Sequence, residues 1–264
     1  PIIIMMTLVF TWRSFVLSRG QVSPLQAFKA NSLVYLGMWL VPARMSEMIK
    51  PFYFKKTSKL PQQQGWALVV KERVWDLFGF ACTSLLTFGL LMDRWAGDSL
   101  GVRVIMLVGV TLIILAVFFI LPRVIHLIPI LNRFDEFAKA LKKATPFEHA
   151  TQACTALLLW FLSIAMITIY YHFSGLPPLP VADLMLIFMV SSLGLVVTVT
   201  PAGLGTYEAA LVAILASYGI GLGEAVAFAI VFRLCWMLVP SLLGVWVILR
   251  DGVTYQEGLN RGSA

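Results

Sequence analysis

Residues 199–208 read V-T-P-A-G-L-G-T-Y-E and separate two apolar segments, 182–199 and 209–220. A proline, two glycines and a carboxylate stand here, where lipid would require an unbroken helix. Non-helical backbone at membrane depth is tolerated only when it is buried in protein or lines a cavity. Transporters commonly build a substrate site near the bilayer midplane from such broken helices. The stretch therefore predicts a broken membrane helix with a candidate site beside it.

The composition is that of a membrane protein. Of the 264 residues, 59% are hydrophobic and only 12% are charged, whereas a soluble domain carries roughly a quarter charged residues. The mean hydropathy is +0.88, and several apolar runs approach the ~20 residues that span a bilayer. We therefore predict an all-α fold, a polytopic helical membrane protein with broken or re-entrant helices.

The net charge of +7 comes mostly from two connecting regions, 43–60 and 123–149. Basic loops are typical of the cytoplasmic side of a membrane, so the charge does not indicate a nucleic-acid partner. We expect these regions and the C-terminus on the cytoplasmic side, and the loops 93–103 and 171–182 outside. The segments flanking residues 200–208 fit two short spans as well as a re-entrant hairpin, and the sequence leaves both open.

We expect one transmembrane domain over residues 1–250 and a polar tail over residues 251–264. Because the chain opens at Pro1 directly in apolar sequence, we expect upstream segments to be missing. Residues 43–60 and 123–149 have apolar side chains at helical spacing, which predicts amphipathic helices on the membrane surface.

The first apolar segment, residues 2–16, predicts the remnant of a spanning helix, followed by a short basic link that contains Arg13 and Arg19. Residues 25–41 are short and polar for a full span, so a half-helix or a tilted segment is expected there.

A similar break occurs in the first half of the chain. Residues 41–47 read V-P-A-R-M-S-E, so both this stretch and residues 200–208 place a Pro-Ala pair before a carboxylate. Arg73 and Arg233 follow these carboxylates at nearly the same distance along the chain, each inside an apolar helix. Paired interrupted segments are the best sequence indication of a transporter site. Such a similarity between two short stretches can also arise by chance. An internal inverted repeat and a chance similarity therefore both stay open as explanations.

Several charged residues fall inside predicted spans, where each costs about 2.5–3.5 kcal/mol. They are Glu72, Arg73, Asp76, Glu208 and Arg233. They could line a polar cavity, pair as a structural cluster, or extend their charged ends to the interface. Asp76 is spaced to pair with another residue on its own helix face, so a functional and a structural role both stay open for it. Arg233 has no carboxylate nearby in sequence, which favours a functional role.

Gly203 and Gly205 can expose backbone N–H groups just before a helix that begins at Thr206, which Thr206 could cap. That geometry binds phosphate or carboxylate, helped by the helix dipole. We therefore expect an anionic lipid head group, with arginines contacting its phosphate and glutamates pairing with them or with a cationic head group. The predicted lipid-binding residues are Arg44, Glu47, Glu72, Arg73, Asp76, Pro201, Gly203, Gly205, Glu208 and Arg233.

No catalytic arrangement is recognisable in the sequence. It has no phosphate-binding Walker loop and no G-x-S-x-G motif, and its three cysteines and three histidines have no metal-ligand spacing. We expect neither a metal nor another cofactor.

Three segments together resemble the lysylphosphatidylglycerol synthase transmembrane-region (flippase) family. Residues 201–211 resemble its P-G-G-L-G-x-x-E-A segment, residues 42–47 its N-x-x-x-P-x-R-x-G-E segment with Asn31 upstream, and residues 71–76 its E-R-x-x-D segment. Phe232-Arg233 fits its helix arginine. The chain departs from the pattern at two positions that are usually glycine, Ser46 and Ala202.

The resemblance implies a membrane fold with re-entrant elements, in the cytoplasmic membrane of a prokaryote. It implies flipping of aminoacylated phosphatidylglycerol, or handling of polyprenyl-phosphate-linked lipids. Synthases of the family charge the lipid in a separate soluble domain, which is not recognisable in this chain, so we expect no enzyme activity.

Two alternatives stay open beside a lipid transporter. The chain could be an accessory or assembly subunit of a larger membrane complex, or form a homo-oligomer, through its apolar faces. It could also transport a small anion coupled to protons or sodium, with Glu72 and Glu208 relaying the ion.

Overall fold

The computed structural model describes residues 1–41, 45–96, 145–195, 200 and 203–262, and every regular element in these ranges is a helix. The elements are α1 (Ile2–Leu17), α2 (Pro24–Met38), the 3₁₀ turn η1 (Met45–Met48), α3 (Ile49–Thr57), α4 (Gln62–Ala96), α7 (Pro146–Phe173), α8 (Val181–Leu193), α9 (Thr206–Ser217) and α10 (Leu222–Gly262). The predicted all-α class is confirmed.

Three helices of the described ranges are long and apolar enough to cross a membrane. They cover Gln62–Met92, Pro146–Phe173 and Leu222–Asp251, with 31, 28 and 30 residues, against the ~20 that a span requires. Helices α1, α8 and α9 are also apolar but shorter. The chain is therefore a multi-pass membrane protein, as predicted. The expected span and most of the surface helix over residues 104–149 fall outside the described residues.

Local sequence explains where the helices begin. Pro24 follows Ser23, whose hydroxyl accepts a hydrogen bond from the Gln26 backbone N–H while the Gln26 side chain accepts one from the Ser23 N–H. This is a capping box with proline in the first turn. Pro146 follows Thr145, which caps α7 by accepting a hydrogen bond from the Glu148 N–H.

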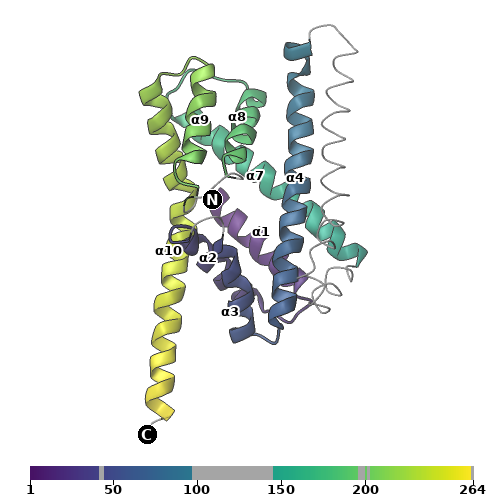
Figure 1. Cartoon of the computed structure of the whole chain (residues 1–264), viewed down its shortest axis with the longest axis vertical. Coiled ribbons are helices and arrows are strands. Elements are labelled where there is room, and N and C mark those ends of the chain that lie inside the picture. The colour runs from purple at the N-terminus through teal and green to yellow at the C-terminus, as the bar shows by residue number, and fades with distance from the viewer. Residues whose placement is uncertain (42–44, 97–144, 196–199, 201–202, 263–264) are drawn as a thin grey trace.

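Helix α10 packs against helices from both halves of the chain (Figure 1). The α8–α9 pair lies beside its upper part, and α2 packs against it farther down. The α2 contact is close, because a Cβ on Gly244 would lie 2.5 Å from the Ser32 carbonyl oxygen. Trp39 also donates a hydrogen bond of 2.8 Å to Ser241 on α10. One long helix is thus fixed to α2 at one level and to α9 at another.

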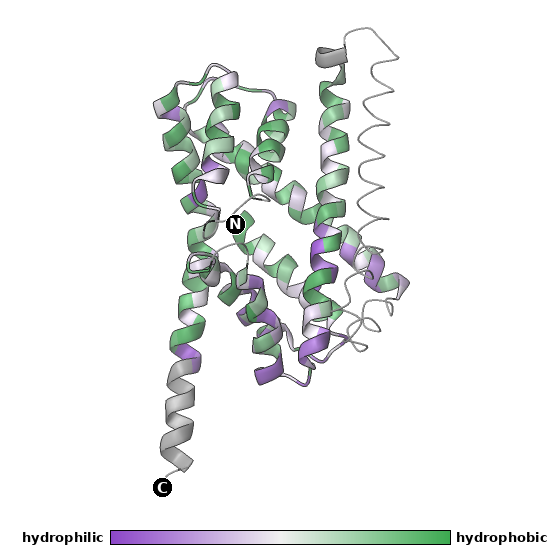
Figure 2. Ribbon diagram, viewed as in Figure 1, coloured by the Kyte–Doolittle hydropathy of each residue, from purple (hydrophilic) through white to green (hydrophobic). Residues whose placement is uncertain are grey.

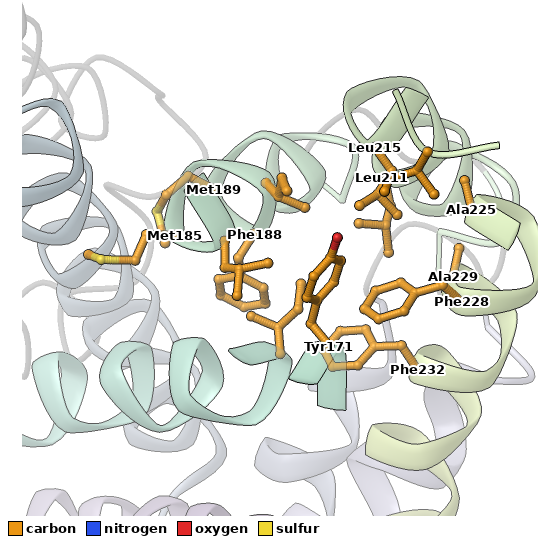
Figure 3. Close-up of a cluster of buried hydrophobic side chains, with 14 of the residues drawn as sticks. Tyr171, Met185, Phe188, Met189, Leu211, Leu215, Ala225, Phe228, Ala229 and Phe232 are labelled. Atoms are coloured by element: carbon orange, nitrogen blue, oxygen red, sulfur yellow. The ribbon is translucent and has the colours of Figure 1, made fainter. Parts of the chain in front are cut away.

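The larger hydrophobic core joins α7, α8, α9 and α10. Tyr171, Phe228 and Phe232 place their rings together, with Leu211 and Leu215 of α9 above them (Figure 3). The Phe228 and Phe232 rings stack with centroids 5.9 Å apart. Figure 2 shows that α8 and α9 are mostly hydrophobic, whereas hydrophilic residues gather on α3 and the adjoining end of α4.

One sequence-based assignment needs correction. Helix α1 continues to Leu17 and contains Arg13, whose side chain is fully buried, so Arg13 does not belong to a basic link. Nothing in the sequence indicates a partner for Arg13, whereas in the structure its side chain reaches Asp76 and the Glu72 carbonyl oxygen on α4. The segment predicted as a surface helix forms α3, which packs against α4 and α2 and buries Lys50 and Phe54. Its position relative to a membrane stays a prediction.

Candidate functional site

The second break ends in two glycines with positive φ. Gly203 has φ 69° and Gly205 has φ 89°, a region that side chains with a Cβ rarely adopt. Helix α9 begins directly afterwards, and the Glu208 carboxylate caps it by accepting a hydrogen bond of 2.8 Å from the Gly205 N–H. Thr206 does not cap the helix as expected; its hydroxyl donates to the Gly203 carbonyl oxygen.

The other carboxylate oxygen of Glu208 faces Arg233 of α10. The Arg233 Nη1 lies 3.2 Å from Glu208 Oε1, and the arginine side chain is only 3% exposed. Its guanidinium lies over the rings of Tyr207, at 5.2 Å, and Trp236, at 5.6 Å. A carboxylate and two aromatic faces therefore stabilise this cation in an apolar surrounding.

The first break has a matching ion pair. Glu47 of η1 lies 3.0 Å from the Nε of Arg73 on α4, and Arg73 Nη1 lies 2.8 Å from Asp76 Oδ2 one turn along the helix. The Arg73 side chain is 35% exposed, whereas that of Arg233 is almost fully buried. The sequence left open whether Asp76 pairs on its own helix face, and in the structure it pairs there with Arg73.

A largely buried network adjoins this first pair. Lys50 of α3 lies 2.6 Å from the Glu72 carboxylate, and Ser14 of α1 donates to the same carboxylate at 2.7 Å. Arg13 pairs with Asp76 at 2.5 Å and also donates to the Glu72 carbonyl oxygen. Removing one partner from such a network leaves a buried charge uncompensated, which is strongly destabilising. Together with Glu47 and Arg73, the network joins α1, η1, α3 and α4.

The structure thus brings the predicted site residues together as two groups. Glu47, Glu72, Arg73 and Asp76 form the first break group, and Gly203, Gly205, Glu208 and Arg233 form the second break group. The predicted residues Arg44 and Pro201 lie outside the described residues.

Sequence reasoning missed several members of these groups. Arg13 stands inside an apolar run, so the argument that a buried charge needs a partner applied to it as well. Lys50 carries no such signal, because it precedes the exposed Lys55 and Lys56 in one basic stretch. Tyr207 and Trp236 look like ordinary apolar residues in sequence, and only the position of Arg233 gives them a role.

Further ion pairs connect segments of the chain away from both breaks. Arg19 binds the Glu148 carboxylate through two nitrogens, at 2.5 and 3.0 Å, and this hydrogen bonding holds the pKa of Arg19 above its usual value. Lys29 of α2 lies 2.5 Å from Asp251 of α10. Among the described residues, no group of three acidic, cysteine or histidine side chains is placed to bind a metal ion.

One family model matches the chain, and its description is "Lysylphosphatidylglycerol synthase TM region". The match covers residues 1–244 and so includes both breaks and both paired arginines. No curated protein and no solved structure matched the chain.

Proposed function

Because the chain belongs to the lysylphosphatidylglycerol synthase transmembrane-region family, we propose that it is a lipid flippase or lipid-carrier transporter. Its substrate would be an anionic or aminoacylated phospholipid, or a polyprenyl-phosphate-linked lipid. It would move this lipid across the cytoplasmic membrane of a prokaryote. The matched family model describes the membrane region of lysylphosphatidylglycerol synthases. This match supports movement of the lipid by this chain rather than synthesis of the lipid.

The observation that supports this function most strongly is the Glu208–Arg233 pair beside a glycine break. A charge in the bilayer centre is costly and usually functional. Here the cation lies beside the start of α9, where the Gly205 N–H donates to the carboxylate of the same pair, and a guanidinium and a backbone N–H together favour phosphate. A pair with only a structural role would not need a positive-φ glycine turn at its side.

The helix lengths support a re-entrant arrangement around the second break. Helices α8 and α9 have 13 and 12 residues and pack against each other. At about 1.5 Å per residue, each reaches roughly 20 Å, less than the ~30 Å hydrocarbon core. We propose that they enter and leave the membrane on the same side, which would place the second break near mid-depth.

The first break group is a second candidate contact for the head group. Arg73 keeps about a third of its side chain exposed while it pairs with Glu47 and Asp76. A lipid phosphate could therefore reach this arginine without disrupting the buried pairs of Arg13 and Lys50. In this proposal the two breaks contact the head group at successive stages of its movement.

Reconstitution in liposomes tests the proposal. Fluorescent phosphatidylglycerol in one leaflet is followed with a membrane-impermeant quencher, for the wild type, Arg233→Gln and Arg250→Gln. Arg250 is a matched control, because it lies on the same helix over the Trp246 ring, at 5.1 Å, but outside the break. We expect wild type and R250Q to move the lipid and R233Q to lose at least tenfold in rate. Wild-type vesicles no faster than empty ones would refute the function.

A further inference from the structure

The Glu208 carboxylate engages two donors that an incoming anion would use. Its Oε2 accepts the Gly205 N–H at 2.8 Å, and its Oε1 lies 3.2 Å from Arg233 Nη1. One carboxylate thus connects a backbone donor at the start of α9 with a guanidinium on α10. Phosphate oxygens favour the same two kinds of donor. The site therefore already contains an anion that belongs to the protein itself.

The Tyr207 hydroxyl is a second observation that indicates an external ligand. Tyr207 is 1% exposed, and among the described residues its hydroxyl has no hydrogen-bond partner. Its ring lies under the Arg233 guanidinium, so the tyrosine belongs to the same site. A buried hydroxyl without a partner is unfavourable, and a ligand oxygen beside Arg233 would give it one.

Glu208 is less buried than its partner Arg233. Its side chain is 18% exposed against 3% for Arg233. The Glu208 side chain can therefore move away from the arginine more easily than the arginine can move with it. The contacts of Arg233 with the Tyr207 and Trp236 rings do not depend on the carboxylate.

We propose that Glu208 is a tethered competitor that binds Arg233 and Gly205 until a lipid phosphate displaces it. The identity of the displacing lipid rests on the proposed function, whereas the competition itself does not. A binding-competent state populated only a tenth of the time weakens apparent affinity about tenfold. Release of Glu208 would then couple head-group binding to a rearrangement at the start of α9.

The substitution Glu208→Gln distinguishes the hydrogen bond of this side chain with Gly205 from its ion pair with Arg233. Glutamine at this position can still accept the Gly205 hydrogen bond, because Gln serves in a capping box as Glu does. It has no charge with which to hold Arg233. Glu208→Asp is the second variant, since its shorter side chain cannot reach both donors together. Glu224→Gln is the matched control, an exposed carboxylate in the first turn of α10.

Native mass spectrometry of the purified protein, titrated with phosphatidylglycerol, measures the competition. We expect E208Q to bind this lipid about tenfold more tightly than wild type if Glu208 holds Arg233 nine-tenths of the time. E208D should change in the same direction, and E224Q should match wild type. The gain should vanish in E208Q/R233Q and shrink in E208Q/Y207F. For phosphatidylcholine, which carries its own ammonium group, the increase in affinity caused by E208Q should be smaller than for phosphatidylglycerol.

The outcomes separate the proposed competition from the proposed function. Equal or weaker phosphatidylglycerol binding by folded E208Q and E208D, or a gain that persists without Arg233, would overturn the competition. That result leaves lipid movement by wild type in liposomes unaffected. If wild type moves no lipid but E208Q still gains affinity through Arg233, the competition stands and the transport function fails.

Discussion

At the first break Glu47 pairs with Arg73, and at the second Glu208 pairs with Arg233, with nitrogen–oxygen distances of 3.0 and 3.2 Å. The surroundings of the two pairs differ. Arg73 is next to Asp76, which also binds the buried Arg13, and the network extends through Glu72 to Lys50. The Arg233 guanidinium instead lies over the rings of Tyr207 and Trp236.

This difference separates two uses of buried charge. In the first break group and its adjoining network with Arg13 and Lys50, several charges share partners, so removal of a buried charge leaves another without its partner. In the second break group the carboxylate can leave while the aromatic faces continue to stabilise the arginine. The first group is therefore suited to stabilise the arrangement of α1, α3 and α4, and the second to exchange its anion.

The largest effect should come from Glu72→Ala. This change leaves Lys50 without its carboxylate and removes the acceptor of Ser14. We expect the free energy of unfolding to fall by about 3–5 kcal/mol, measured by thermal or denaturant unfolding in detergent. Glu224→Ala, at an exposed position, is the control. A loss no greater than that of E224A would show that the first network does not stabilise the fold.

The corresponding change in the second break group is Glu208→Gln. It removes the charge opposite Arg233 but keeps an acceptor for the Gly205 N–H. The unfolding free energy should fall by about 1–3 kcal/mol, the cost of leaving a buried polar group without its partner. If E208Q destabilises as much as E72A in the same assay, the proposed contrast between the groups is wrong.

Glycines that precede the two breaks give a finer comparison. A Cβ on Gly194 would lie 2.6 Å from the Thr206 carbonyl oxygen, whereas one on Gly37 would lie 2.5 Å from Cδ1 of Ile49. Backbone cannot move aside as a flexible side-chain end can. We expect Gly194→Ala to cost about 1–3 kcal/mol and Gly37→Ala to cost less, measured by thermal unfolding side by side. The reverse order would contradict tight backbone packing at the second break.

The smallest expected effect belongs to Tyr207→Phe. The hydroxyl has no partner among the described residues, and the ring under Arg233 is retained. The protein should unfold at the same free energy or be stabilised by up to about 1 kcal/mol. A clear destabilisation would mean that the hydroxyl already has a partner and is not available to a ligand.

Much of the candidate site was predictable because charged residues stand out in apolar sequence. Glu208 and Arg233 had to be paired or hydrated, and the structure pairs them with each other. The partners themselves depend on tertiary packing, which brings side chains of α1 and α3 to Glu72 and Asp76 on one face of α4. Arg13 was therefore assigned to a loop, and Lys50 could not be distinguished from the exposed lysines that follow it.

The order and type of the helices were also largely predictable, since hydrophobic length and proline positions mark their ends. Pro24 begins α2 as expected, and the short apolar arm after the second break is the short helix α9. The close contact of Gly244 with α2 could not be read from sequence, because a glycine inside an apolar helix does not identify its neighbour.

The charge balance of the first network has an electrical consequence. Its cations Arg13, Lys50 and Arg73 are matched by its anions Glu47, Glu72 and Asp76. A transmembrane voltage acts on net charge, at about 2.3 kcal/mol per elementary charge for each 100 mV. The matched group therefore experiences almost no net force from the membrane potential. A voltage dependence of transport would then report on charges outside this network, among them the charge of the lipid as it crosses.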